Sequence, residues 1–164
     1  MMFPIAAFDR IDDDEADRFL QEAGHYLGAC ERPFGRQSFG LFLHDALVSV
    51  AVSASTVAST CGGWPRGQVV ELARLCTSPA HRDLTRVALR FWRVSAPAAW
   101  SAKYWPVRAV VSYSDRTRHS GNIYRFDGWT KIADVAGSGG GGTYSTPKAR
   151  TPKSVWCFEV QEAA

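Results

Sequence analysis

The middle of the chain carries the pattern that most constrains the fold: a strand, a helix and a second strand in succession. Residues 68–76 (QVVELARLC) form an apolar run of strand length, and residues 107–113 (VRAVVSY) form another. Between them, residues 81–96 repeat apolar side chains at helical spacing along one face. Helices interleaved with strands in this way indicate an α/β sheet that mixes hairpin and crossover connections.

The flanking segments fit the same class of fold. Asp12 and Glu15 stand in the capping-box relation, and the apolar spacing that follows predicts a helix ending near Gly28. Two β-rich runs that meet at a polar break predict a hairpin, residues 38–45 and 46–55. The remaining predicted elements are strands at residues 3–8, 129–137 and 154–160 and a short helix just before Trp129.

Length and composition support a single folded unit. With 164 residues, 46% of them hydrophobic, the chain can bury one core, so we predict one domain over residues 1–164. The low-complexity segment 137–154 is predicted to be a flexible glycine-rich loop within it. Four scattered cysteines without a CxxC pair predict reduced thiols. The chain has neither an apolar run of membrane-span length nor a basic signal-peptide start, which predicts a cytoplasmic protein.

Charged residues interrupt the apolar pattern in two places. Strict alternation along the strand at 68–76 would place Arg74 on the same face as Leu72 and would place Glu71 on the other face. Buried charges at these positions need partners. The helix at 81–96 carries basic residues opposite its apolar face, and Pro97 is expected to interrupt or kink it. These basic residues are Arg82, Arg86, Arg90 and Arg93.

Polar side chains gather in the stretch VVSYSDRTRHSGNIYRFDGW (110–129). Asp115 directly follows a strand, and the carboxyl ends of strands in an open α/β sheet face the ligand crevice. It is therefore a candidate base for an amine, or else an ion-pair partner of Arg74. Tyr124 is a candidate acid or hydrogen-bond donor, or else a core tyrosine.

The same stretch supplies candidate substrate-binding residues, which are Ser112, Tyr113, His119 and Gly121. His119 could present donors to an anion near a helix N-terminus or could cap that helix. Tyr113 could equally belong to the core. His44, in the predicted hairpin, is expected to be a solvent-facing turn residue. Because the four histidines show no ligand spacing, we assign no metal.

The order of elements resembles the GNAT acyltransferase fold, which implies a mixed central sheet flanked by helices. In that family a glycine-containing loop before the central helix presents backbone N–H groups to the pyrophosphate of acetyl-CoA. The corresponding segment here, PAHRDLTRVAL (79–89), contains no glycine, and its bulky side chains would obstruct that approach. The donor therefore stays open between acetyl-CoA and another small molecule.

A narrower resemblance covers residues 70–129 and the glycine-rich loop. The ELARL strand, the SYSD strand end, the HSGNIY turn and the following GW are similar to Mom-like phage DNA-modification proteins, within the GNAT superfamily. That family converts adenine in DNA to its N6-carbamoylmethyl derivative, which shields the DNA from restriction. The segment RFDGW departs from the family pattern. The resemblance implies a transferase acting on double-stranded DNA, with Asp115, Tyr124 and Arg74 as its catalytic residues.

On this interpretation, exposed basic residues contact phosphates, and these are Arg82, Arg86, Arg116, Arg118, Lys148 and Arg150. The glycine-rich loop could close over an extruded base, or it could be an insertion without a function. The basic row on the helix could likewise be only a solvated face. Two alternatives remain: an acyl-CoA-dependent N-acyltransferase acting on a small amine or a protein, and a non-catalytic DNA-binding protein.

Overall fold

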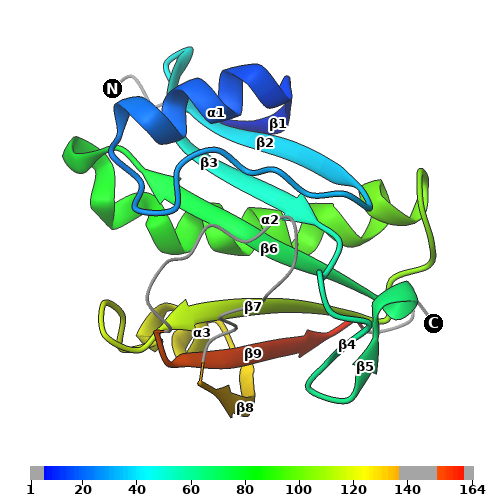
Figure 1. Cartoon of the computed structure of the whole chain (residues 1–164). Helices are drawn as coiled ribbons and strands as arrows, with labels where there is room; N and C mark the ends of the chain where they lie inside the picture. Colours follow the sequence, from blue (N-terminus) through cyan, green and yellow to red (C-terminus); the bar gives the residue numbers. More distant parts are fainter. Residues whose placement is uncertain (1–5, 137–150, 161–164) are drawn as a thin grey trace.

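A seven-stranded mixed sheet forms the centre of the computed structural model, which describes residues 6–136 and 151–160 (Figure 1). The strands follow the order β1–β2–β3–β6–β7–β9–β8, and only β6 and β7 pair in parallel. The predicted α/β fold is thereby confirmed. The strands are β1 (Ala6–Ile11), β2 (Arg36–Leu43), β3 (Ala46–Ala54), β6 (Val69–Thr77), β7 (Ala109–Asp115), β8 (Thr130–Val135) and β9 (Lys153–Glu159).

The predicted hairpin is the pair β2–β3. Its two turn residues, His44 and Asp45, have φ values of +48° and +64°, which is the backbone of the tight turns that match strand twist. His44 is exposed there, as predicted. A smaller hairpin, β4 (Thr60–Cys61) with β5 (Trp64–Pro65), lies outside the main sheet.

Two helices cover opposite faces of the sheet (Figure 1). The first, α1 (Asp13–Glu22), buries Ala16 and Leu20 against β2 and β3. The second, α2 (Thr85–Ser101), buries a longer apolar face on the other side, and α3 (Asn122–Phe126) lies beside it. Among the described helices, none is long and apolar enough to cross a membrane.

The helix boundaries differ from the sequence prediction. The first helix ends at Glu22 rather than near Gly28, because the chain turns at Gly24, which has a φ of +68°. The Asp12 side chain makes no capping hydrogen bond, so the capping-box prediction is wrong. Pro97 does not end the second helix, because its ring is buried and the apolar face continues.

A β-bulge in β6 corrects the predicted strand faces. Val52 pairs with Arg74, but its neighbour Ser53 pairs with Leu72, so Ala73 is an extra residue in β6. Leu72 therefore packs in the α2-side core, whereas Arg74 reaches the chain that follows α1. Strict alternation had placed both on one face.

Other strand ends also moved. The strand predicted at 3–8 is β1, at 6–11, while residues 1–5 lie outside the described part. The predicted strands at 129–137 and 154–160 correspond to β8 and β9. Most of the predicted glycine-rich loop, residues 137–150, lies outside the described residues.

Candidate functional site

The parallel strands β6 and β7 pair along only part of their length. Their hydrogen-bonded register runs from Val69 opposite Ala109 to Leu72 opposite Ser112. Beyond that point, residues 74–77 of β6 pair with β3 and residues 113–115 of β7 pair with β9. Figure 1 shows the two strands diverging. We call this opening the splay; along it, the β6 edge has no strand partner among the described residues.

On the α2 side, a buried hydroxyl pair marks the start of the splay. The Ser112 hydroxyl donates to the carbonyl oxygen of Leu72 at 3.2 Å and lies 2.9 Å from the Tyr124 hydroxyl. The Ser112 hydroxyl has one proton, which it uses in the hydrogen bond to Leu72, so the Tyr124 hydroxyl must be the donor in its hydrogen bond with Ser112. Two predicted site residues, from β7 and α3, are therefore in contact.

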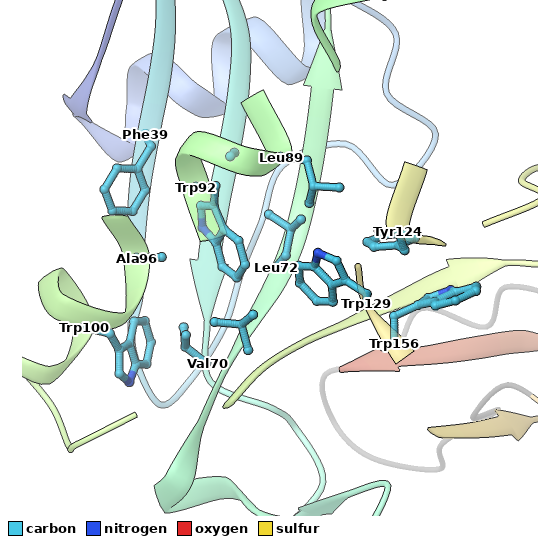
Figure 2. Close-up of a cluster of buried hydrophobic side chains, with 12 residues drawn as sticks. Phe39, Val70, Leu72, Leu89, Trp92, Ala96, Trp100, Tyr124, Trp129 and Trp156 are labelled. Atoms are coloured by element: carbon cyan, nitrogen blue, oxygen red, sulfur yellow. The ribbon is translucent and has the colours of Figure 1, made fainter. Parts of the chain in front are cut away.

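The Tyr124 ring is enclosed by indoles. It stacks on Trp156, with centroids 5.4 Å apart, and meets Trp129 edge-on at 5.3 Å. Figure 2 shows these three rings together at one end of the buried cluster. Burial raises the pKa of Tyr124 to about 12, although the hydrogen bond with Ser112 acts in the opposite direction. The Tyr124 hydroxyl is therefore protonated at neutral pH.

Gly121, a predicted substrate-binding residue, also has a structural role. It precedes α3 with a φ of +78°, and a Cβ atom there would collide with the Trp156 ring. Only glycine allows the turn to approach Trp156 this closely. The tight turn is what brings Tyr124 back over β7.

Asp127, which the sequence analysis missed, binds two of the four arginines that were predicted to line one face of the second helix. Its buried carboxylate accepts hydrogen bonds from Arg90 at 2.9 Å, Arg93 at 2.6 Å and the Trp129 indole at 2.9 Å. Burial acts to raise the Asp127 pKa, but these donors hold it below its usual value. Arg90 and Arg93 thus join α2 to the end of α3. Arg86 is exposed, with its guanidinium 5.2 Å from the Phe126 ring.

The α1 side of the splay is charged. Arg74 donates three hydrogen bonds, all to main-chain carbonyls: those of Gly28 at 3.1 Å, Ala29 at 3.0 Å and Ala73 at 2.8 Å. Burial lowers its pKa. The ion pair with Asp115 that the sequence allowed is not formed. Glu71, by contrast, has the partner expected of a buried charge, because Arg32 binds both its oxygens at 2.8 and 3.1 Å.

Asp115 lies at the end of β7, as predicted, and is buried. Its Oδ1 accepts hydrogen bonds from the Thr117 amide at 2.8 Å and the Thr117 hydroxyl at 2.6 Å, while its Oδ2 lies 3.5 Å from Arg118 Nε. Burial acts to raise the Asp115 pKa, but the Thr117 hydrogen bonds and the Arg118 and His119 charges hold it below its usual value. The carboxylate therefore stays ionised and fixes the turn that follows.

Tyr26 joins this group, because the helix that was predicted to run to near Gly28 ends at Glu22. The Arg118 guanidinium lies 4.6 Å from the centre of its ring. The rings of His25 and His119 lie 5.1 and 6.3 Å from it. The break at Gly24 was the sequence signal that Tyr26 leaves the helix.

Other predicted residues lie apart from this group or outside the description. Tyr113 donates to Cys61 Sγ at 3.0 Å, on the sheet face opposite to Ser112. Arg116 is exposed in the turn after β7, and its amide donates to the carbonyl of Pro152. Arg82 is exposed in the 3-10 helix Pro79–Leu84, which precedes α2. Lys148 and Arg150 lie outside the described residues.

Surface hollows and metal-binding groups do not mark another site. A hollow of about 550 Å³ adjoins Asp12–Glu15 and Arg18, and one of about 300 Å³ lies between Trp64, Thr130 and Phe158. The residues that line these two hollows are not those of the splay. Within the described ranges, no three His, Cys, Asp or Glu side chains converge in a possible metal site.

No protein-family model matches the sequence, and no curated protein matches it by sequence. Solved structures do match. The ribosomal-protein-S18-alanine N-acetyltransferase of Escherichia coli aligns over 98% of this chain and 97% of its own, with a TM-score of 0.66 and 10% identity. The fold is that of the GNAT acetyltransferases.

Two further GNAT structures show the same fold at similarly low identity. Arabidopsis thaliana NAA60, in complex with acetyl-CoA, covers 95% of this chain and 99% of its own, with a TM-score of 0.63 and 9% identity. Aminoglycoside 6′-acetyltransferase type Ii covers 96% and 99%, with a TM-score of 0.63 and 11% identity. Nothing in the comparisons indicates Mom-like DNA modification.

Proposed function

We propose that the protein is an acyl-CoA-dependent N-acyltransferase whose chemistry takes place at the splay. The observation that carries the proposal is the buried Ser112–Tyr124 hydroxyl pair, placed where β6 and β7 part. The GNAT fold supports it, because the matching structures include acetyltransferases for protein and aminoglycoside acceptors. This was the alternative to DNA modification at the sequence level.

The residues at the splay fit an acyl-CoA donor, but a different segment stands where GNAT acyltransferases have their glycine-containing loop. The free edge of β6 at residues 74–77 offers main-chain groups that can bond the amides of an extended arm. The segment between β6 and α2, Pro79–Leu84, is a 3-10 helix without glycine. Exposed Arg82 and Arg86 would therefore supply charge for phosphates in place of loop amides. When bound, the donor supplies an activated thioester.

In this proposal Tyr124 is a hydrogen-bond donor rather than a full proton donor. Its pKa of about 12 lies well above that of a thiol, about 8.5, so a departing thiolate would not remove its proton. A buried, oriented hydroxyl can nevertheless stabilise negative charge that develops on a substrate atom. That substrate atom would replace the Ser112 hydroxyl as the hydrogen-bond acceptor of Tyr124.

Asp115 and Arg74 act as positioning residues. Asp115 has a lowered pKa and accepts two hydrogen bonds from Thr117, which makes it a weak base. Its carboxylate holds the turn that carries Arg118 and His119. Arg74 fixes the chain after α1 through its bonds to Gly28 and Ala29.

The test combines binding with transfer. Isothermal titration of the purified protein with acetyl-CoA should show saturable binding, which a variant combining Arg82→Ala with Arg86→Ala weakens at least tenfold. Mass spectrometry of amine and peptide panels incubated with acetyl-CoA should then show a gain of one acetyl group on an acceptor. Failure to bind any of acetyl-, propionyl- or malonyl-CoA in a folded sample would reject the proposal.

DNA adenine modification rests on the sequence resemblance. Among the basic residues of α2, Arg90 and Arg93 are bound to Asp127, which leaves fewer cations for phosphates. Nucleoside mass spectrometry of DNA from expressing cells would test it. A new adenosine species in cells with the wild-type protein, absent with Asp115→Ala, would restore DNA as the substrate.

A further inference from the structure

The α1 side of the splay holds more positive than negative charge. Arg74 and Arg118 both approach it, and both contribute to the electrostatic surroundings of Tyr26 together with Asp115. Glu71 and Asp17 also act on Arg74, but they are paired with Arg32 and Arg36. Asp115 is therefore left as the carboxylate facing Arg74 and Arg118 among the described residues, and the two guanidiniums leave a positive excess. His119 lies beside them.

Asp115 does not neutralise either arginine fully. Its Oδ1 is taken by Thr117, and its Oδ2 is 3.5 Å from Arg118 Nε, which is long for a charge-assisted hydrogen bond. The Arg118 side chain is 56% exposed. Arg74 has five N–H donors, of which three bond to carbonyls, so two are left without a partner among the described residues. The residue itself is half-buried.

The behaviour of His25 reports the same positive surroundings. Burial, together with the nearby charges of Arg74 and His119, lowers its pKa to about 4. His25 accepts a hydrogen bond from the Leu27 amide through Nδ1 at 3.3 Å. The imidazole is therefore neutral at pH 7 and adds no positive charge, and the smaller part of the shift, due to Arg74 and His119, reports positive charge near its ring.

We infer that this side of the splay binds a carboxylate of the acceptor, held by Arg118 and Arg74 beside Tyr26. The inference rests on the proposed acyltransfer and names its acceptor class: an amine that also carries a carboxylate, such as an amino acid or a short acidic peptide. Guanidinium groups match the two oxygens of a carboxylate. The acceptor amine would extend from this side of the sheet toward the Tyr124 hydroxyl.

Matched acceptors test the inference. Each amine is offered with acetyl-CoA as the free acid and as the carboxamide: β-alanine with its amide, 4-aminobutanoate with its amide, and glycylglycine with its amide. The wild type should acetylate the acids with a kcat/KM at least tenfold above that of the amides. The preference should appear mainly in KM, because a remote charge contact contributes to binding in both ground and transition states.

Two arginines of the same turn provide the variant and its control. Arg118→Ala should lower the kcat/KM for the acids at least tenfold, to the level of the amides, and so abolish the preference for acids. Arg116→Ala should keep the preference, because Arg116 is equally exposed but contributes its charge near Asp134 of β8. Acetylation of acids and amides with equal efficiency, or a preference that survives Arg118→Ala, would overturn the inference while leaving acyltransfer intact.

A binding measurement without donor separates this inference from the proposed function. Glutarate should raise the melting temperature of the wild type and of Arg116→Ala, but not of Arg118→Ala, and neutral glutaramide should raise none of them. Glutarate binding that depends on Arg118, without any acetyl transfer, would keep the anion site and reject the acyltransferase. Absence of glutarate binding in a folded wild type would overturn the anion site.

Discussion

The two sides of the splay present opposite environments. On the α2 side, Tyr124 and Ser112 form a hydroxyl pair among indole rings, and no charged side chain in the described part of the chain is in hydrogen-bond contact with them. On the α1 side, Arg74, Asp115 and Arg118 lie around Tyr26, partly open to solvent. Where β6 and β7 part, the sheet therefore carries neutral, buried side chains on one face and charged, partly exposed side chains on the other.

This difference suggests a division of work between the two sides. An enclosed hydroxyl with a raised pKa keeps its proton and can stabilise developing charge, since few water molecules compete for it. A partly exposed group of arginines is better suited to capture and orient an anionic ligand. Perturbing the α2 side should therefore affect the chemical step or the core, whereas perturbing the α1 side should affect binding and local order.

The largest expected effect comes from the enclosed side. Tyr124→Phe removes the hydroxyl and keeps the ring between its tryptophans, so kcat should fall about 10²–10³-fold while KM changes little. The free energy of unfolding should change by about 1 kcal/mol or less, which urea titration can verify. Wild-type kcat in this variant would mean that both sides of the splay serve binding alone.

The next effect tests how tightly the enclosed side is packed. Gly121→Ala puts a methyl group against the Trp156 ring at a positive φ, and should lower the free energy of unfolding by about 2–4 kcal/mol. Gly128→Ala is the matched control. Its φ is +84°, but its nearest atom, on Phe158, is 3.7 Å away, so it should cost only about 1–2 kcal/mol. Equal losses in the two variants would show that backbone strain alone, and not the contact with the Trp156 ring, sets the cost.

On the charged side, a smaller and more local loss is expected. Arg74→Met keeps most of the side-chain length but removes three hydrogen bonds to carbonyls, for an expected cost of about 1–3 kcal/mol. Hydrogen exchange should accelerate at the amides of residues 28–30. Arg125→Met also removes hydrogen bonds, to Ser120 and Asn122, but these are exposed to solvent, so it should cost no more than about 1 kcal/mol and leave exchange at residues 28–30 unchanged. Unchanged exchange at residues 28–30 would show that Arg74 does not fix this chain.

The smallest expected effect is the pH dependence contributed by His25. Its pKa is about 4 in the folded protein against 6.5 for an ordinary histidine. Between these values the unfolded chain binds the proton more readily, so stability is full above pH 6.5 and falls as the pH decreases toward 4. The slope from this residue should be at most about 1.4 kcal/mol per pH unit.

Stability curves between these pH values should therefore be shallower for His25→Asn than for the wild type. Asparagine can keep an acceptor for the Leu27 amide without titrating. His44→Asn, in the exposed hairpin turn at a positive φ, is the control and should keep the wild-type slope. Identical slopes for all three proteins would contradict the buried, neutral state of His25.

Local patterns made much of the fold predictable. The β2–β3 hairpin followed from alternation around a polar break, and α2 followed from its apolar spacing. The side of the sheet to which each β6 side chain points could not be predicted in this way. The bulge at Ala73 depends on how β3 pairs with β6, which alternation within one strand cannot reveal. One inserted residue moved Arg74 to the other side of the sheet.

The site was predictable where it lies in one continuous stretch. Asp115, His119 and Tyr124 follow one another along the chain, so their closeness could be expected from sequence. Tyr26 and Asp127 could not be found in that way, because long-range contacts define their roles: Tyr26 meets Arg118, and Asp127 meets α2. The lowered pKa of Asp115 likewise depends on the Thr117 bonds and nearby charges that appear only in the folded chain.

The most direct test of the account is to map acetyl-CoA onto the protein by ¹⁵N NMR. If the splay binds the donor, the amides of residues 74–77 on the free edge of β6 should shift with saturation, together with the Tyr124 amide. The amides of Trp64, Thr130 and Phe158, around the separate hollow, should stay unchanged. Saturable shifts confined to that hollow, with residues 74–77 unaffected, would contradict the assignment of the splay as the site of acyl transfer.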